Sequence, residues 1–270
     1  MTGAIFPPEA YSAGEQFQRE KQMLFARRWL LFAASGQMPA AGDCVAHGIG
    51  GWPLFAVRGT DGIARAFHNV CRHQCMPVVD QGPGHFEALR CRYHGWTYGF
   101  DGRLAEAPPR HAPDRPVAEI ALTTAELAER DGLCFVRVEP AGAAPPEFGF
   151  ADRQFVAALT TEIDANWKAV VEPLLEIGGW HFAFPLALVG DGVIRQIVPR
   201  TFSRTRIIDL IFTGDGTANE AGRRERAADK SAAEACQARR AAGEPPPATG
   251  SVADFLAAVA ASCAAGTPQA

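Results

Sequence analysis

Two cysteine–histidine pairs constrain this chain more than any other feature. The stretch CRHQCMPVVDQGPGHFEALRCRYHGW contains Cys71-x-His73 and, after seventeen residues, Cys91-x-x-His94. Two thiolates and two imidazoles suit a zinc ion, or a two-iron cluster in which thiolates hold one iron and imidazoles the other. A zinc ribbon would more usually show Cys-x-x-Cys knuckles, and neither pair is one. The spacing therefore favours a histidine-ligated two-iron cluster, which is suited to passing single electrons.

The surrounding sequence predicts a β-rich domain followed by a mixed one. Residues 1–37 read as a helical lead-in that ends in an extended segment. From residue 42 to about 140, short alternating runs broken by Gly-Gly and Asp-Gly predict hairpins, and AGAAPPEFG then reads as a linker. Residues 152–180 are expected to be helix-rich, 193–215 to form two strands, and 221–243 to form a helix. Ser251 is a plausible N-cap of a short terminal helix.

Composition excludes several classes of function. The 270 residues are 47% hydrophobic and 21% charged, with a formal net charge of -4, so there is no basic stripe for nucleic acid or an anionic membrane. No apolar run reaches the roughly 18 residues of a membrane span, and the N-terminus lacks a signal-peptide pattern. We therefore expect a cytoplasmic protein. Seven cysteines, an odd number, favour metal ligation or burial over disulfides.

The chain resembles the large (alpha) subunit of Rieske-type non-haem iron oxygenases, the ring-hydroxylating and O-demethylating enzymes, from about Tyr11 to about Arg240. The resemblance is carried by FARRW, PAAGDCV, PLFAVRGTDG, AFHNVCRH, CRYHGWTYGFDGRL, DGLCFV, NWKAVVEPLLE and ADKSAAEACQ. It implies an α+β fold, with an antiparallel β Rieske domain at 38–145 and a truncated helix-and-sheet (helix-grip-like) catalytic-type domain at 150–270. It also implies that four residues bind a [2Fe-2S] cluster: Cys71, His73, Cys91 and His94.

The second half departs from the family pattern. Members of the family hold a mononuclear Fe(II) with two histidines and one carboxylate. Aligned on its acidic helix and closing proline, LLEIGGWHFAFP has Gly179 and Phe184 at the two histidine positions, and Asp229 matches the carboxylate. We therefore expect a vestigial iron position without mononuclear Fe(II). Only 44 residues separate Phe184 from Asp229, which leaves room for about two strands and predicts a reduced substrate pocket.

Further residues near these sites carry weaker expectations. Glu176 matches the family carboxylate that bridges one subunit's cluster to its neighbour's iron, so it is a candidate electron-path residue. His181 lies two positions after Gly179, about 200° around a helix, and could serve as a ligand only if the glycines of IGGW end that helix early. Cys75 is expected to be a free buried thiol. Trp96 and Tyr98 are expected to pack around the cluster loop.

Three functional hypotheses follow. The first, which we favour, is an oxygenase-system subunit that lacks its own iron site and serves electron transfer or assembly with a catalytic alpha subunit. It would work in a mixed, trimer-type ring and receive electrons from a ferredoxin or flavin reductase. The second is a complete oxygenase with an atypical iron site around Glu176, His181 and Asp229. The third is a stand-alone ferredoxin-like carrier.

Overall fold

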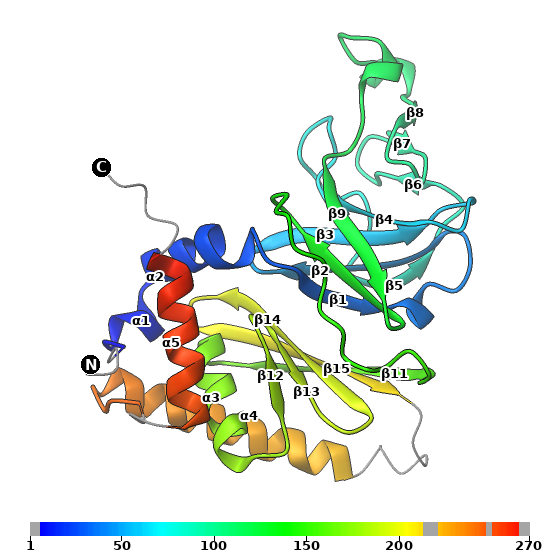
Figure 1. Cartoon of the computed structure of the whole chain (residues 1–270). Helices are drawn as coiled ribbons and strands as arrows, with labels where there is room; N and C mark the ends of the chain where they lie inside the picture. Colours follow the sequence, from blue (N-terminus) through cyan, green and yellow to red (C-terminus); the bar gives the residue numbers. More distant parts are fainter. Residues whose placement is uncertain (1–5, 213–220, 247–249, 265–270) are drawn as a thin grey trace. The chain divides into compact units, whose positions relative to one another are not determined.

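The computed structural model describes residues 6–212, 221–246 and 250–264, which fall into two compact units. The first unit is Leu31–Asp152, and the second joins Met1–Leu30 to Arg153–Ala270. Antiparallel sheets form the first unit, and a sheet with α-helices forms the second (Figure 1), so the α+β class is confirmed. The expected lead-in 1–37 does not form a unit of its own. Its helices group with the second unit, and its extended end joins the first unit's sheet.

A seven-stranded sheet in the order β1-β10-β9-β4-β3-β2-β5 runs through the first unit, beside a small sheet β6-β7-β8. The pairs from β10 to β5 are antiparallel, which confirms the predicted hairpins. The strands are β1 (Leu30–Ala34), β2 (Asp43–Ile49), β3 (Trp52–Arg58), β4 (Ala64–His68), β5 (Gly82–His85), β6 (Leu89–Arg90), β7 (Thr97–Tyr98), β8 (Leu104–Glu106), β9 (Thr124–Arg130) and β10 (Leu133–Arg137). Short 3₁₀ turns are η2 (Ser35–Gln37), η3 (Pro109–His111) and η4 (Val117–Glu119).

The hydrophobic core of the first unit reaches to the cysteine loops. Phe55 and Phe67 belong to this core, with ring centroids 5.5 Å apart, and Cys71 and Cys91 belong to the same cluster of buried residues. Gly102, in an Asp-Gly turn, has φ 82°, and a Cβ added there would lie 2.3 Å from the ring of Phe67. This turn therefore requires glycine for both its backbone conformation and its close approach to the core.

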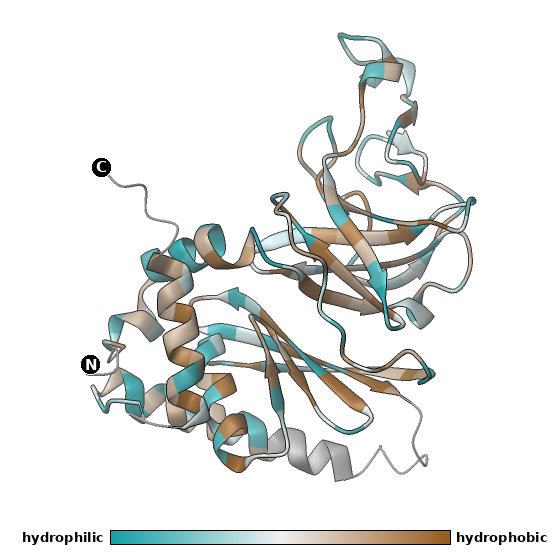
Figure 2. Ribbon diagram, viewed as in Figure 1, coloured by the Kyte–Doolittle hydropathy of each residue, from teal (hydrophilic) through white to brown (hydrophobic). Residues whose placement is uncertain are grey.

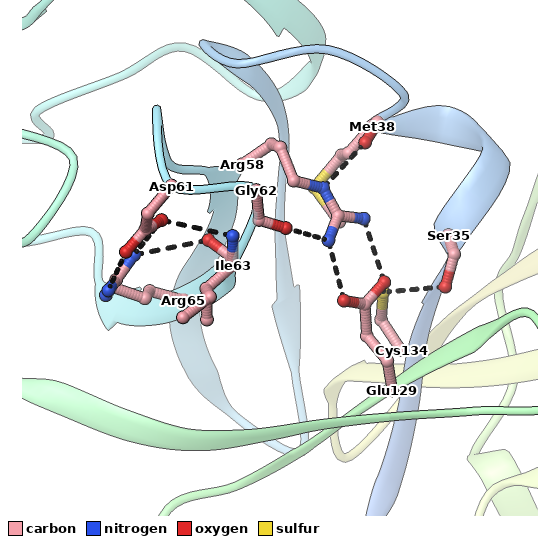
Figure 3. Close-up of polar contacts among 9 residues, drawn as sticks. All are labelled: Ser35, Met38, Arg58, Asp61, Gly62, Ile63, Arg65, Glu129 and Cys134. Carbon is pink, nitrogen blue, oxygen red and sulfur yellow. Dashed lines mark hydrogen bonds and ion pairs between the residues drawn. The ribbon is translucent and has the colours of Figure 1, made fainter.

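An arginine links the two strands of the large sheet that lie on either side of β4. The guanidinium of Arg58 on β3 makes a two-pronged ion pair with Glu129 on β9, at 2.6 and 2.8 Å (Figure 3). It also donates to the carbonyls of Met38 and Gly62. Such paired, planar contacts hold both side chains in one geometry, so they fix β3, β9 and the Gly62 turn together.

The second unit contains one five-stranded sheet in the order β11-β15-β14-β13-β12. Its strands are β11 (Phe155–Ile163), β12 (His181–Ala183), β13 (Ala187–Val189), β14 (Val193–Thr201) and β15 (Arg204–Phe212). The prediction of β14 and β15 is confirmed. The prediction of helix over 152–166 is wrong, because β11 alternates exposed and half-buried residues with period two. Three described strands, not two, lie between Phe184 and Asp229.

Helices complete this unit, and those at 167–177 and 221–241 contact the sheet. The helices are α1 (Glu9–Ser12), α2 (Gly14–Glu20), a π-helical turn η1 (Lys21–Phe25), α3 (Trp167–Ile177), α4 (Ala221–Ala241) and α5 (Ser251–Ala264). Asn166 caps α3 by accepting from the Lys168 N–H at 3.0 Å, and Gly178, with φ 84°, ends it. The cap predicted for α5 is wrong. The Ser251 hydroxyl donates to the carbonyl of Leu175, and the Gly250 carbonyl accepts the first helical bond.

Buried charges attach the N-terminal helices to α3. Lys168 and Glu20 are both fully buried, and their Nζ and Oε1 atoms lie 2.6 Å apart. Trp167 Nε1 donates to the other Glu20 oxygen at 2.7 Å. Four further side chains form a second buried polar group along α1, α3 and α4: Tyr11, Glu172, Cys236 and Arg240. These contacts explain why residues 6–30 belong with the second unit.

The apolar residues follow the sheets and the covered helix faces. Figure 2 shows brown stretches along the strands of the second unit. Within the described ranges, no helix combines the length and apolar character that crossing a membrane requires.

Candidate functional site

Two loops of the first unit carry the four predicted cluster ligands, and their backbones follow one pattern. The Cys71 N–H donates to the Met76 carbonyl and the Cys75 N–H donates back to Cys71, at 2.7 and 3.0 Å. In the second loop, Cys91 donates to Trp96 and Gly95 donates back to Cys91, both at 2.9 Å. Each cysteine is therefore bonded to the residues four and five positions later. The two loops present their side chains as a matched pair.

The fourth residue after each cysteine has a left-handed backbone. Gly95 has φ 74°, which glycine adopts at no steric cost. Cys75 occupies the same position of the first loop with φ 57°, and it is exposed. The prediction of a buried thiol at Cys75 is therefore wrong. The tight loop turns its side chain outward, to the solvent.

The two loops bring the four predicted ligands together. The cysteine thiols face the core of the unit, and the histidine imidazoles lie nearer the surface. Cys71 and Cys91 are each 2% exposed at the core, and their thiols interact directly. His73 and His94 are half-buried, with ring centroids 4.6 Å apart. Two sulfur donors at the core and two nitrogen donors nearer the surface match a [2Fe-2S] cluster with one thiolate-held and one imidazole-held iron. The donor set fits that group.

Aromatic side chains support the ligands, as predicted. The hydroxyl of Tyr98 lies 3.2 Å from Cys71 Sγ and accepts from the Arg72 N–H at 3.0 Å. Trp96 stacks on His73, with centroids 4.9 Å apart and planes 16° apart. Burial raises the pKa of the Cys71 thiol, and burial also raises the pKa of Tyr98. A thiolate at Cys71 therefore requires a cationic partner, which iron would provide.

Two supporting residues were missed by sequence reasoning. Asn69 is buried, and its Oδ1 accepts from the N–H groups of Val78 and Val79 at 2.8 and 3.1 Å, closing the first loop. Its place two residues before Cys71 was a usable signal. The carbonyl of His111 accepts from Trp96 Nε1 at 2.8 Å, and the His111 ring lies 4.4 Å from that of His94. Nothing local in the sequence indicated this contact.

In the second unit, Asp229 is engaged by an arginine. Asp229 Oδ2 lies 2.5 Å from Arg195 Nη1, and Asp209 also binds the same guanidinium. Burial alone would lower the pKa of Arg195, but its hydrogen bonds and charge attraction to the two aspartates raise it. The Arg195 side chain therefore stays cationic beside the predicted vestigial carboxylate.

The other predicted positions of the iron site lie on the segment after α3. Gly179 has φ 80° in an open turn, and Phe184 packs 6.0 Å from Phe182 by ring centroid. The glycines do end α3 early, yet His181 begins the edge strand β12 with its side chain exposed. Glu176 is also exposed, at the last turn of α3.

These residues do not fit a mononuclear Fe(II). Neither Gly179 nor Phe184 offers a ligand atom, and Asp229 is paired with a guanidinium that would repel a divalent ion. Among residues 6–212, 221–246 and 250–264, no three His, Cys, Asp or Glu side chains gather as one metal ion would need. Each iron of a Rieske cluster takes only two protein ligands, so this does not bear on the first unit.

Sequence comparison finds a known domain in the first unit and several relatives of the chain. Residues 28–125 match the Rieske [2Fe-2S] domain model. The carnitine monooxygenase oxygenase subunit of Acinetobacter baumannii is 27% identical over 185 residues, covering 63% of this chain and 50% of the relative. The glycine betaine monooxygenase oxygenase subunit of Chromohalobacter salexigens is 32% identical over 177 residues, covering 62% and 40%. The chain thus spans about half the length, or less, of these curated relatives.

Structural comparison agrees on the fold. The quaternary ammonium Rieske monooxygenase CntA in complex with L-carnitine matches with a TM-score of 0.81 at 20% identity, over 96% of this chain and 95% of that one. The matched Rieske domain and the related oxygenase subunits confirm the resemblance carried by the sequence motifs. The chain thus contains a Rieske [2Fe-2S] domain and is similar to large oxygenase subunits of Rieske-type oxygenases.

Proposed function

We propose that the chain is the Rieske [2Fe-2S] component of an oxygenase system, taking single electrons from a reductase and passing them to a mononuclear iron. The observation that carries the proposal is the pair of matched loops, which hold two core-facing thiols and two outer imidazoles. The imidazoles lie nearer the surface, where an electron partner can approach. The cluster supplies one-electron chemistry when bound, and the protein holds its ligands and shields its thiolate side.

The geometry of the second unit favours an iron that lies in a partner subunit. Of the three predicted iron-ligand positions, only Asp229 carries a side chain that can bind a metal, and its carboxylate is paired with Arg195. We therefore propose a mixed ring, in which this chain delivers electrons to, or completes the assembly of, a catalytic alpha subunit. The electron donor would be a ferredoxin or a flavin reductase. Glu176, exposed at the end of α3, is available to a neighbouring subunit.

The comparisons favour the second hypothesis, a complete oxygenase. The relatives are named as oxygenase subunits, and the fold of CntA is matched over 96% of this chain, including the second unit. They lend no support to the absence of mononuclear iron. In a complete oxygenase, Asp229 would have to exchange Arg195 for a metal, and other donors would have to replace the two missing histidines.

A metal count on the isolated chain, beside electron paramagnetic resonance, decides between these functions. A Rieske component without its own iron gives about two irons per chain and the spectrum of a histidine-ligated cluster. A reproducible third iron that Asp229→Asn removes would establish the complete oxygenase instead. His73→Ala should abolish the cluster and the electron transfer. His85→Ala is the matched control, because His85 is an exposed histidine bonded to Asp43.

Assembly is tested by co-expression with a longer oxygenase subunit. The proposed component should co-purify with that subunit and raise its reductase-dependent turnover, and the His73→Ala variant should co-purify without doing so. A chain that stays separate and turns over substrate alone would contradict the mixed ring.

A further inference from the structure

Arg195 forms a charge cluster with Asp209 and Asp229 in the second unit. Electron transfer through the Rieske unit does not require this cluster. Strand register places Arg195 on β14 directly opposite Asp209 on β15. The guanidinium binds both oxygens of Asp209, with Nε–Oδ1 at 2.7 Å and Nη2–Oδ2 at 3.1 Å. Its third bond goes to Asp229 on α4, at 2.5 Å. One cation therefore joins two strands of the sheet to a helix.

The cluster is enclosed. The side chains of Arg195 and Asp209 are each 5% exposed, and that of Asp229 is 14% exposed. The ring of Trp180 covers the guanidinium, with Cζ 4.7 Å from the ring centroid, which adds a cation–π contact. Trp180 directly follows Gly179, the first of the two lost histidine positions. Arg195 is thus bounded by the predicted carboxylate ligand and by the segment that would have carried a histidine ligand.

Two buried carboxylates need a positive charge between them. Without one, their desolvation and mutual repulsion would be costly, so buried charges are normally paired or bound to a metal. We propose that Arg195 is a resident cation that takes the place of a metal ion at Asp229, holding α4 to the sheet and excluding divalent ions. This inference deepens the proposed function, because it names what occupies the second site if the iron lies in another subunit.

Removing the arginine charge should turn the cluster into a metal site. In the cluster-loaded full chain, Arg195→Leu leaves Asp209 and Asp229 facing a space without a cation. The variant should melt below the native chain, and Co(II) should raise its melting temperature in a concentration-dependent way while native melting stays unchanged. The double variant with Asp229→Asn should lose most of this rise. Lys230→Leu, which removes an exposed cation one residue from Asp229, should show no Co(II) response.

Two results would overturn the inference. One is an Arg195→Leu variant that folds and does not respond to Co(II). The other is a native chain that binds Co(II) stoichiometrically and loses this binding on Asp229→Asn. If Arg195→Leu does not fold, the Co(II) titration of the native chain tests the inference by itself. Absence of stoichiometric Co(II) binding to the native chain then supports Arg195 as the resident cation.

The outcomes also separate this inference from the proposed function. A native chain with two irons and an unresponsive Arg195→Leu variant would overturn only the inference. A native chain that assembles no [2Fe-2S] cluster would overturn only the proposed electron transfer, because the Co(II) response belongs to the other unit.

Discussion

Removing the phenol oxygen of Tyr98 should lower the reduction potential of the cluster. This oxygen lies 3.2 Å from Cys71 Sγ and already accepts the Arg72 N–H, so its own proton is available to the sulfur. A metal-bound thiolate can only accept that proton. Reduction adds negative charge to the cluster, so the hydrogen bond stabilises the reduced form more than the oxidised form.

The size of the effect follows from the strength of such a bond. Hydrogen bonds to charged groups contribute about 1.5–3 kcal/mol, and we take about 1 kcal/mol of this as the difference between the two redox states. For a one-electron couple, about 59 mV corresponds to a tenfold change in equilibrium constant, so Tyr98→Phe should lower the potential by roughly 40 mV. Because Tyr98 is fully buried and phenylalanine keeps the ring, the packing around the loop should be retained.

The assay is a redox titration of the full chain followed by electron paramagnetic resonance. Tyr93→Phe is the matched control, because it removes the same atom from a tyrosine that is 50% exposed and beside His94. That variant should titrate within about 10 mV of the native chain, well inside a tenfold change in equilibrium constant. An unchanged or raised potential in Tyr98→Phe would refute the assigned bond.

Three further perturbations test the scaffold. Lys168→Met leaves the buried Glu20 without its cation and should lower the free energy of unfolding by about 3–5 kcal/mol in urea titrations. Cys75→Gly should raise the stability of the first unit by up to about 1 kcal/mol by relieving φ 57°, whereas Cys75→Ala should not. The hydrogen bond from Arg58 holds the pKa of Glu129 below its usual range, so its stabilisation exists above the unfolded pKa and is lost as pH falls through the folded pKa. Glu129→Gln should therefore destabilise the chain at pH 7, and the gap from native should close below about pH 4.

The cluster site was predictable because its information is local. Each Cys–His pair lies in one short loop, and the spacing alone limits which metal centre the loops can hold. Helix α4 was likewise visible in its own composition. Strand β11 was mispredicted because its sequence, FVAALTTEI, does not alternate apolar and polar residues; the period of two from Phe155 to Ile163 is seen only in the exposure of its side chains in the fold.

The second site was only half predictable. The absence of two histidines could be read from an aligned motif, but the partner of Asp229 could not. Arg195 reaches it through the register of β14 with β15 and the position of α4, and both depend on contacts between residues far apart in the chain. The pairing of Glu20 with Lys168 could not be predicted for the same reason, because the two residues lie 148 positions apart and no local pattern indicates the contact.

The discontinuous second unit sets an order for folding during synthesis. Residues 31–152 form a continuous unit, so their contacts with one another can form once that stretch has left the ribosome. Glu20, in contrast, must wait for Lys168, which lies 148 residues later. At about 5–20 residues per second, this delay is roughly 7–30 s. The nascent chain can therefore receive its iron and sulfide while the N-terminal helices still lack their partners, so cluster insertion need not await the rest of the protein.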